Sequence, residues 1–329
     1  MNKLYLITGA TGHLGSVLVK TLLDKKCNVK TLVLKNEEKY LPENVDYVIG
    51  DVCDKESLKP FFEHEGYDKV SLIHCAGIVS ISSKPNPFIW KVNVDGTRNI
   101  LDCALEYNID RVIYVSSVHA LPELAYPEVI IETKDLSKDK VTGEYAKTKA
   151  EAAKLCFEYA QKGLNISVVH PSGILGPGDI RKNNHSVNSL KAMYEGKIPV
   201  GLSGGYDFVD VRDVATGILQ CEENGRSNEN YILSGHYLSV MDMLRICNEL
   251  KGKRPSKIKV PYKLVKMIAP IAEWCTDNVL KIKPMITPYS IYTLNSNSRF
   301  SHHKASEQFG YKTRDIRETI EDTVLDKGI

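Results

Sequence analysis

A tyrosine and a lysine that are four positions apart, Tyr145 and Lys149, lie within the helix-forming stretch from Gly143 to Ala153. Residues at this spacing project from one face of a helix. A free tyrosine has a pKa of about 10 and is a poor acid or base at neutral pH, but an adjacent ammonium group favours the phenolate. Lys149 could therefore tune Tyr145 for proton transfer with a substrate oxygen. A tyrosine and a lysine exposed on a helix surface are the alternative interpretation.

Two serines, Ser116 and Ser117, end a predicted strand that begins at Arg111. In open parallel sheets, ligands bind at the carboxyl ends of the strands. A serine hydroxyl there could hold a substrate oxygen while a hydride moves between the substrate carbon and a nicotinamide ring. A Ser-Ser pair is by itself typical of a loop, so its weight depends on the neighbouring motifs.

The beginning of the chain predicts the element that would hold such a cofactor. Leu4 to Thr8 is an apolar run typical of a buried parallel strand, and a helical pattern then continues to Asp24. Three glycines, Gly9, Gly12 and Gly15, lie where the strand turns into the helix. They would allow a tight turn, the approach of a pyrophosphate and close packing of helix on strand. The pattern predicts a dinucleotide phosphate site, with an ordinary glycine turn as the alternative.

Further apolar runs, separated by helical patterns, predict more parallel strands: Asn28 to Leu34, Val45 to Ile49, Val70 to Cys75 and Asn165 to Pro171. One long helix is predicted from Asn86 to Tyr107, with Asn93 hydrogen-bonded to the neighbouring strand. We therefore predict an α/β fold with a Rossmann-type doubly wound parallel sheet.

The end of the second strand bears on the choice between NAD and NADP. The run ends Leu32-Val33-Leu34-Lys35-Asn36, with no carboxylate at its tip. Because Lys35 could pair with a 2′-phosphate, NADP is favoured over NAD, although a solvated lysine is an equal alternative. Asp51 follows the third strand and would either lie beside the adenine or cap the helix that starts near Asp54.

These motifs together resemble the extended short-chain dehydrogenase/reductase superfamily, of the NAD-dependent epimerase/dehydratase kind. The resemblance rests on Thr8 to Gly15, on the Ser-Ser pair, on the Tyr-x-x-x-Lys spacing and on the segment His170 to Gly178. The run Gly204 to Ala215 is similar to that of dihydroflavonol reductase-like and 3β-hydroxysteroid dehydrogenase-like members, and Lys304-Ala305 with Phe309-Gly310-Tyr311 resembles their C-terminal helix. It implies an NAD(P)-binding Rossmann domain over residues 1–172, with a strand and helix returning near 203–235, and a smaller substrate lobe over residues 173–329.

The resemblance also implies roles for particular residues. The catalytic residues would be Ser117, Tyr145 and Lys149. Besides Tyr145 and Lys149, the cofactor would contact Gly9, Thr11, Gly12, His13, Leu14, Gly15, Lys35, Asp51, Val52, Cys75, Ala76, Gly77, Asn93, Val115, Ser116, His170, Pro171, Ser172 and Gly173. The substrate would contact Val79, Ser117, His119 and Ile174. Asp210 and Asp213 are expected to form ion pairs with Arg212 rather than to act as an acid and a base.

The substrate lobe is less informative. Ile180 to Met193 is polar and predicts a lid, and the amphipathic stretch Pro261 to Cys275 predicts core or a lid over an apolar substrate rather than a membrane anchor. A nucleotide-sugar enzyme would need a basic clamp for a diphosphate, whereas Arg181, Arg226 and Arg245 are isolated. A small apolar or aromatic substrate is therefore favoured.

Bulk properties exclude several other classes. The 329 residues carry a net charge of +2, which gives no field suited to nucleic acid, and the eight cysteines are scattered singly, so we expect no metal site. The longest apolar run, Val70 to Ile81, is too short to cross a bilayer, and no signal peptide precedes the first strand. A cytoplasmic protein with no membrane partner is expected, and family analogy implies a homodimer formed through the helices Asn86 to Tyr107 and Gly143 to Lys162.

The function predicted first is an NAD(P)-dependent oxidoreductase that interconverts a carbonyl and an alcohol through Ser117, Tyr145 and Lys149. The alternative is a nucleotide-sugar epimerase or dehydratase that uses the same three residues. A non-catalytic regulator that senses NAD(P) is a third reading, disfavoured because such proteins usually lack the tyrosine and the lysine.

Overall fold

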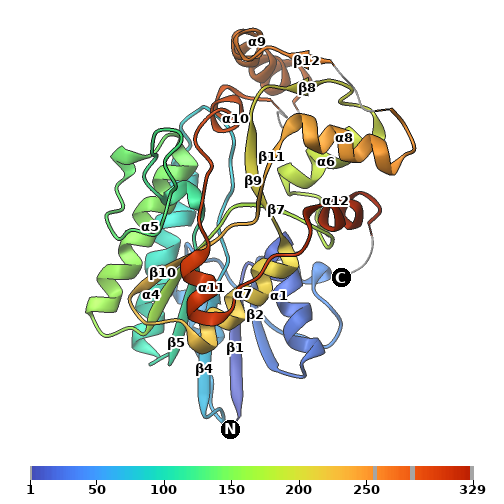
Figure 1. The fold of residues 1–329 in the computed structure, drawn as a ribbon. Coiled ribbons are helices and arrows are strands. Elements are labelled where there is room, and N and C mark those ends of the chain that lie inside the picture. Colours follow the sequence, from blue (N-terminus) through green and yellow to red (C-terminus); the bar gives the residue numbers. More distant parts are fainter. Residues whose placement is uncertain (1, 255–257, 282–285, 327–329) are drawn as a thin grey trace.

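The protein is built on a seven-stranded parallel sheet in the order β10-β6-β5-β4-β1-β2-β3 (Figure 1). The structure is a computed structural model and describes residues 2–254, 258–281 and 286–326. The strands of this sheet are β1 (Lys3–Thr8), β2 (Asn28–Val33), β3 (Asp46–Ile49), β4 (Lys69–His74), β5 (Arg111–Val115), β6 (Ile166–Pro171) and β10 (Glu229–Leu233). The predicted Rossmann-type sheet is confirmed.

Both faces of the sheet are buried because its strands are apolar on both sides. Leu4 and Leu6 point into one core, and Tyr5 and Ile7 into the other. The first core is covered by α2 (Lys55–Phe62), α4 (Thr97–Glu106) and α5 (Glu144–Gln161), and the second by α1 (His13–Asp24) and α7 (Val211–Asn224). The sheet is therefore the middle layer of a three-layer α/β sandwich, as Figure 1 shows.

The strand order reverses direction around β1. This strand pairs with β2 on one side and with β4 on the other, so the helices that follow β1 and β4 leave on opposite faces. A crevice at the carboxyl ends of the strands is expected at such a switch point, and dinucleotides bind there in folds of this type.

A smaller lobe sits above the carboxyl ends of the strands (Figure 1). Its sheet has the order β11-β9-β7, in which β7 is Gly173–Leu175, β9 is Gly205–Asp210 and β11 is His236–Ser239. A short pair joins β8 (Gly201–Leu202) to β12 (Lys259–Val260). The helices of the lobe are α6 (His185–Glu195), α8 (Val240–Leu250), α9 (Tyr262–Cys275), η5 (Thr276–Leu280), α10 (Pro288–Thr293) and α12 (Ile316–Val324).

The remaining elements connect these layers. The helix α11 (His303–Phe309) returns to pack on α7, and the short helices η1 (Glu38–Tyr40), η3 (Val118–Ala120) and η4 (Lys138–Lys140) lie in loops. Within the described ranges, no helix is long and apolar enough to cross a bilayer.

Two predicted elements differ in the structure. The helix predicted from Asn86 to Tyr107 begins as α3 (Pro87–Trp90), widens into the π-helical η2 (Lys91–Gly96) and continues as α4. The stretch predicted as a polar lid, Ile180 to Met193, is in its second half the helix α6, because Val187, Leu190 and Met193 are buried against the lobe.

Candidate active site

The glycine turn between β1 and α1 has no room for a side chain at Gly9 or at Gly15. Gly9 has a φ of +70°, and a Cβ there would lie 2.7 Å from the backbone nitrogen of Ala76. A Cβ on Gly15 would lie 2.1 Å from the carbonyl oxygen of Gly9. Gly12 caps α1, and Leu14 follows in its first turn, so the helix presents its free N–H groups at this turn. The turn fits a diphosphate group, which such a helix start binds through N–H groups and the helix dipole.

The loop after β7 closes on this turn. The Nε2 atom of His13 lies 2.9 Å from the carbonyl oxygen of Pro177, and the side chain of Ser16 donates to the carbonyl of Gly178. The amide of Asn184 donates to Nδ1 of His13 at 2.8 Å, so the histidine is a neutral imidazole that donates from Nε2. Burial lowers the pKa of His13 accordingly.

A carboxylate that sequence reasoning missed lies beside the turn. Thr11 donates to Glu37 at 2.8 Å, and Arg181 pairs with the same carboxylate at 2.6 Å. Lys35, the predicted phosphate ligand, is exposed just after β2. The predicted isolation of Arg181 is wrong, because its loop folds back across the chain onto Glu37. Only the tertiary fold brings these residues together, so no local pattern marked them.

The structure excludes one predicted role of Asp51, that of capping the helix that starts near Asp54. The residue that caps α2 is Asp54, whose side chain accepts from the backbone N–H of Glu56. Asp51 instead accepts from the backbone N–H of Cys53 at 2.9 Å. The neighbouring Val52 is buried in the core against Gly96, and its carbonyl oxygen accepts from Asn99.

The segment after β4 passes beneath the site with small side chains. The N–H of Ala76 donates to Thr8, and Cys75 lies against Gly9. A Cβ on Gly77 would lie 3.5 Å from the ammonium nitrogen of Lys149, so the glycine leaves space beside this lysine.

Asn93 ties this segment to the helix α5. Its side-chain oxygen Oδ1 accepts from the backbone N–H of Ile78 at 2.7 Å, and its side-chain NH₂ donates to the carbonyl of Ile78 and to Thr148. The predicted hydrogen bond of Asn93 is thus made to the loop after the strand. The wide turn of η2 places this amide, and such π turns are frequent at functional sites.

Ser117 and His170 meet at the ends of β5 and β6. The side chain of Ser117 accepts from the backbone N–H of His119, and Nδ1 of His170 donates to the carbonyl of Ser117 at 3.0 Å. Burial lowers the pKa of His170 to about 4, so the ring is neutral. The hydroxyl of Ser116 and Nε2 of His170 are buried without a hydrogen-bond partner among the described residues, and both lie where the resemblance implies a cofactor.

Tyr145 and Lys149 lie on the buried face of α5, as their spacing predicts. Burial raises the pKa of Tyr145 to about 12, and the side chain of Ser117 partly opposes this rise. Burial lowers the pKa of Lys149 to about 8. The lysine donates to the carbonyl of Val115 at 2.8 Å and lies over the ring of Tyr114. The predicted lowering of the Tyr145 pKa by Lys149 is therefore not seen in this arrangement, because the ammonium faces Val115.

His119 stands in an aromatic group that includes two unpredicted tyrosines. Its ring stacks on Tyr206 at 5.5 Å and meets the ring of Tyr145 edge-on at 5.9 Å. Its Nε2 lies 3.0 Å from the hydroxyl of Tyr206, and its Nδ1 lies 3.4 Å from that of Tyr289. Desolvation lowers the pKa of His119 to about 4. Tyr206 lies in β9 and Tyr289 in α10. Both are far from His119 in the sequence, so no sequence motif indicated that they would contact it.

The other predicted contacts spread around this group. Val79 is exposed in the loop after β4. Pro171 ends β6 and Ser172 is buried after it, while Gly173 packs so closely on Phe208 that a Cβ would lie 2.8 Å from its ring. Ile174 is partly buried in β7, where its carbonyl accepts from Asn184.

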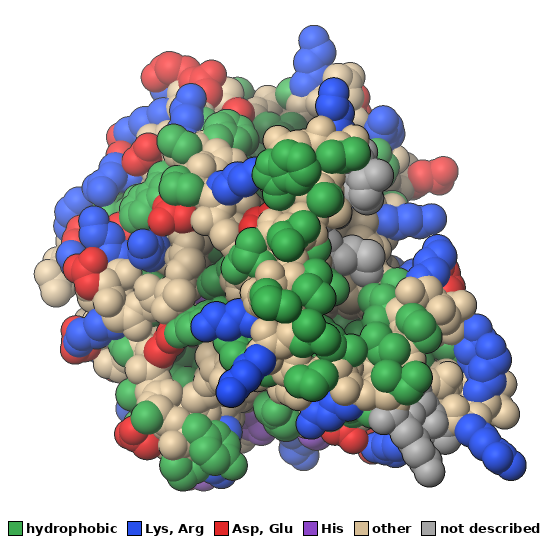
Figure 2. All heavy atoms as spheres, turned by 90° about the horizontal axis from the view of Figure 1, so that it is seen from above, with side chains coloured by type: hydrophobic (Ala, Val, Ile, Leu, Met, Phe, Trp, Pro, Cys, Tyr) green, Lys and Arg blue, Asp and Glu red, His purple; other side chains and the backbone are tan. Residues whose placement is uncertain are grey.

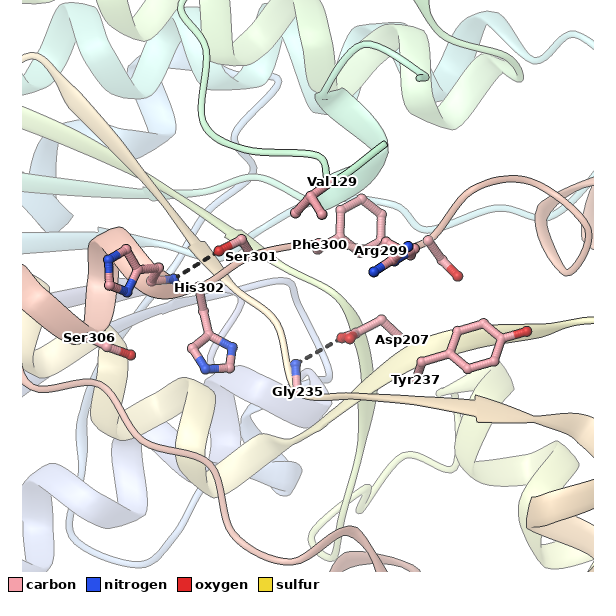
Figure 3. A pocket seen from close by; sticks show the side chains of 11 residues that line it. Val129, Asp207, Gly235, Tyr237, Arg299, Phe300, Ser301, His302 and Ser306 are labelled. Carbon is pink, nitrogen blue, oxygen red and sulfur yellow. Dashed lines mark hydrogen bonds between the residues drawn. The ribbon is translucent and has the colours of Figure 1, made fainter. Parts of the chain in front are cut away.

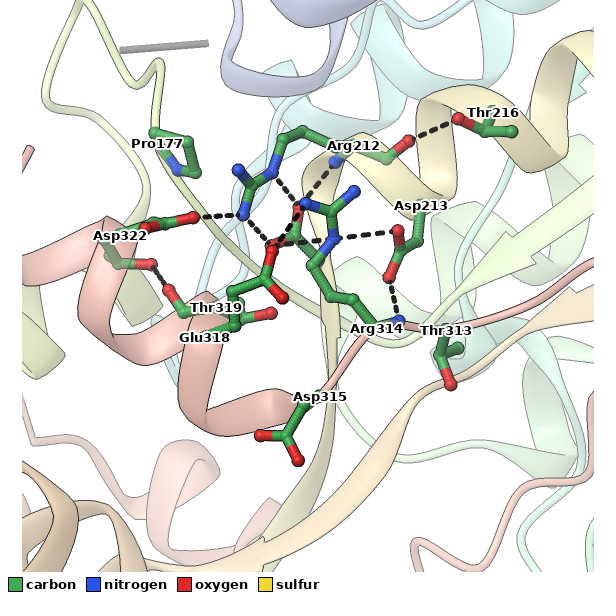
Figure 4. Close-up of polar contacts among 12 residues, drawn as sticks. Pro177, Arg212, Asp213, Thr216, Thr313, Arg314, Asp315, Glu318, Thr319 and Asp322 are labelled. Atoms are coloured by element: carbon green, nitrogen blue, oxygen red, sulfur yellow. Dashed lines mark hydrogen bonds and ion pairs between the residues drawn. The ribbon is translucent and has the colours of Figure 1, made fainter. Parts of the chain in front are cut away.

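Asp210 and Asp213, at the start of α7, form ion pairs that hold structural elements together. Asp210 caps α7 and binds Arg212 through both carboxylate oxygens, and Asp213 accepts from Arg314 at 2.9 Å (Figure 4). Arg212 also reaches Asp322 of α12 at 2.8 Å. The expected pair with Arg212 is confirmed for Asp210, whereas Asp213 pairs with Arg314 instead. The contact between Arg212 and Asp322 joins the sheet domain to the C-terminal helix.

A hollow of about 480 Å³ lies elsewhere, between the sheet of the small lobe and the segment before α11 (Figure 3). Asp207 lies at its base and accepts from the N–H of Gly235, and burial raises the pKa of Asp207 to about 6. None of Ser117, Tyr145 and Lys149 lines this hollow. The three predicted catalytic residues lie instead just after β5 and in the first turns of α5.

The fold and the site define a class. A parallel sheet with a glycine turn at its switch point, an extra lobe above it, and a serine, a tyrosine and a lysine beside the crevice are the features of an extended short-chain dehydrogenase/reductase. The family model described as "NAD dependent epimerase/dehydratase family" matches residues 5–234. The chain therefore belongs to that family, a family of NAD-dependent oxidoreductases, epimerases and dehydratases.

Individual relatives agree with this assignment. The chain is 28% identical to sterol demethylase protein B of Methylococcus capsulatus over 97% of this chain and 96% of that protein. It is 24% identical to 3 beta-hydroxysteroid dehydrogenase type 7 of Mus musculus over 94% of this chain and 90% of that protein. Among solved structures, that of gox2253 superposes with a TM-score of 0.83 at 28% identity, covering 98% of this chain and 97% of that one.

Proposed function

We propose that this enzyme reduces a carbonyl to an alcohol, or catalyses the reverse oxidation, on a small apolar or aromatic molecule. The observation that carries the proposal is the grouping of Ser117, Tyr145 and Lys149 at the ends of β5 and α5, beside the glycine turn that fits a diphosphate. When bound, the nicotinamide cofactor supplies or accepts the hydride.

Tyr145 is the proposed proton donor in the direction of reduction. Its hydroxyl gives a proton to the substrate oxygen as the carbonyl carbon gains the hydride, and it regains a proton from solvent. Its raised pKa of about 12 means that the phenol is protonated at neutral pH, as a donor must be. In oxidation the phenolate is needed, and the ammonium of Lys149 would stabilise it after turning away from Val115.

Ser117 is proposed to hold the same substrate oxygen. Its backbone is fixed by His170 and its side chain by the N–H of His119, so the hydroxyl is oriented before a substrate arrives. Such preorganised donors stabilise charge that develops on oxygen in the transition state.

The surroundings favour an apolar substrate. His119, Tyr206 and Tyr289 form an aromatic wall beside Tyr145. Two of the three arginines considered for a diphosphate clamp are already paired, Arg181 with Glu37 and Arg245 with Asp242 and Glu249. The names of two relatives, a sterol demethylase protein and a hydroxysteroid dehydrogenase, point to apolar ring compounds in those proteins.

For the cofactor we propose NADP in preference to NAD. Lys35 supports this choice because it follows β2 without a carboxylate at the strand tip, although Glu37 lies nearby. We also propose a homodimer through the helices over residues 86–107 and 143–162, on family analogy alone.

The test is a screen of aldehydes and ketones, with sterol-like and aromatic compounds included, followed at the nicotinamide absorbance with NADPH and with NADH. We expect net consumption of NADPH with an apolar carbonyl compound. Turnover of a nucleotide sugar without net consumption of cofactor would instead identify an epimerase, because an epimerase returns its hydride.

A further inference from the structure

The helix α9 has an inner and an outer apolar face. Val265 and Ala269 point inward and pack with Ile291 of α10. On the outer face lies a stripe whose members recur at helical spacing and are 43–66% exposed: Leu264, Met267, Ile268, Ile271 and Trp274. We call these five residues the α9 stripe. Of the two roles predicted for this stretch, core or a lid over an apolar substrate, the core role is therefore wrong for the outer half of the helix.

An apolar stripe of this kind is unusual on a helix that faces water. A surface helix ordinarily turns its apolar face to the core and a polar face to water. Single exposed apolar side chains need no explanation, but a contiguous row of them marks an interaction surface. The α9 stripe therefore calls for a partner.

The charges around the stripe are positive. Lys263 and Lys266 lie on the exposed edge of α9, whereas its carboxylate, Glu273, is buried and accepts from the backbone N–H of Ser83. Figure 2 looks down on the end of the molecule where α9 lies and shows apolar side chains gathered there, with lysine and arginine along the edges. Apolar residues with a tryptophan, bordered by lysines, are typical of helices that lie in a membrane interface.

The stripe lies next to the loop that leads to the predicted active site. Glu273 holds Ser83, and Thr287 donates to the carbonyl of Ile81 at 2.6 Å. The same loop, which follows β4, carries the exposed Val79, a predicted substrate contact. A surface seated on α9 would thus also lie close to the loop that carries Val79.

We propose that the α9 stripe, with Lys263 and Lys266, seats the protein on the surface of a bilayer that contains anionic phospholipid. The apolar side chains enter the boundary between head groups and acyl chains, and the lysines pair with lipid phosphates. The helix lies on the membrane and does not cross it. If the proposed function holds, an apolar substrate then passes from the lipid to the site past the loop that carries Val79.

Co-sedimentation of the purified full-length chain with vesicles tests this proposal without any enzyme assay. We expect the protein to sediment with phosphatidylcholine vesicles that contain phosphatidylglycerol, less with phosphatidylcholine alone, and less at high salt. The double variant Met267→Ser/Ile271→Ser should lower the sedimented fraction at least about fivefold, because it removes two of the most exposed apolar groups. The variant Lys263→Gln/Lys266→Gln should remove the preference for anionic vesicles.

The matched control is Tyr47→Ser/Ile131→Ser, which removes two exposed apolar side chains from other surfaces. It should sediment like the unaltered chain. Equal sedimentation of the Met267→Ser/Ile271→Ser variant, or no binding to anionic vesicles at all, would overturn the proposal. So would a light-scattering mass that falls from dimer to monomer in that variant, because the stripe would then be covered by a second copy. Failure of the carbonyl screen leaves the vesicle result unaffected, so the two proposals can fail separately.

Discussion

The Nδ1 atom of His170 lies 3.0 Å from the backbone carbonyl oxygen of Ser117, and this contact joins the end of β6 to the proposed catalytic serine. Because a carbonyl can only accept, the ring is the tautomer that donates from Nδ1. His170 is fully buried and its pKa is lowered to about 4, so it stays neutral throughout the working range. We infer that it positions Ser117 and takes no part in proton transfer.

Replacing His170 should show whether it positions Ser117 through this hydrogen bond. The variant His170→Leu loses the hydrogen bond and should lower kcat about five- to tenfold, since one such bond contributes about 1 kcal/mol. The variant His170→Asn places an amide N–H near the former Nδ1 and should recover most of kcat. Steady-state kinetics of both variants give the comparison, with circular dichroism to check the fold. If the asparagine variant is as slow as the leucine variant, the positioning role is refuted.

Tyr145→Phe tests the proposed proton donor. It removes the hydroxyl while keeping the ring that meets His119 edge-on. We expect kcat to fall about a hundredfold or more, with cofactor affinity measured by fluorescence titration nearly unchanged. The control is Tyr289→Phe, which removes a hydroxyl from the same aromatic group and should have a much smaller effect on kcat. Undiminished rates in Tyr145→Phe would exclude the assigned role.

The choice of cofactor should depend on charge beside the glycine turn. Lys35→Ala should raise KM for NADPH about tenfold and leave KM for NADH unchanged, because only NADPH carries the 2′-phosphate. Glu37→Gln removes the carboxylate that pairs with Arg181 and should favour NADPH further. The control is Lys39→Ala, which removes another exposed lysine from the same segment. Equal changes for both cofactors in Lys35→Ala would show that Lys35 does not contact the 2′-phosphate.

Buried histidines should make the protein sensitive to acid. Burial lowers the pKa of His74 from 6.5 to about 3, and its ring is held between Thr8 at 2.6 Å and Thr97 at 3.1 Å. Between pH 6.5 and 3 the unfolded chain binds a proton that the folded chain does not, so the free energy of unfolding falls as the pH falls. His170 acts in the same direction between pH 6.5 and 4.

The effect should be visible in urea unfolding. At pH 5, each of these histidines should reduce the free energy of unfolding by up to about 2 kcal/mol relative to pH 7. The variant His74→Asn should show a weaker pH dependence, whereas His303→Asn, a change at an exposed histidine, should keep it. A pH dependence that is the same in His74→Asn and in the unaltered chain would contradict this account.

Local patterns predicted the parts of the site that lie close together in sequence. The glycine turn is a contiguous stretch, and Tyr145 and Lys149 share one helix face, so their geometry follows from the local backbone. Ser117 could be placed because the buried strand β5 ends only two residues before it. Parallel strands then bring their carboxyl ends to one edge whatever the loops do.

The rest of the site depends on contacts between distant parts of the chain. Tyr206 and Tyr289 reach His119 from β9 and α10. Glu37 pairs with Arg181 beside the glycine turn, although the two residues are far apart in the sequence. Periodicity indicates that a face is apolar but not what covers it, which is why Pro261 to Cys275 could be identified as an amphipathic helix while its exposed outer stripe could not.

The ion pairs around α7 give a final prediction about stability. Arg314 donates from Nε to Asp213, which is 7% exposed, and its guanidinium lies 3.6 Å from Asp210 (Figure 4). The variant Arg314→Met would leave the Asp213 carboxylate with only a backbone N–H donor and should lower the free energy of unfolding by about 2–3 kcal/mol at neutral pH, because a desolvated charge loses its partner. The difference should shrink in acid, where protonation removes the carboxylate charge. Arg245→Met, which breaks exposed pairs with Asp242 and Glu249, should cost no more than about 0.5 kcal/mol. Urea titrations of both variants decide the matter, and equal losses would mean that the α7 cluster stabilises the fold no more than a surface pair does.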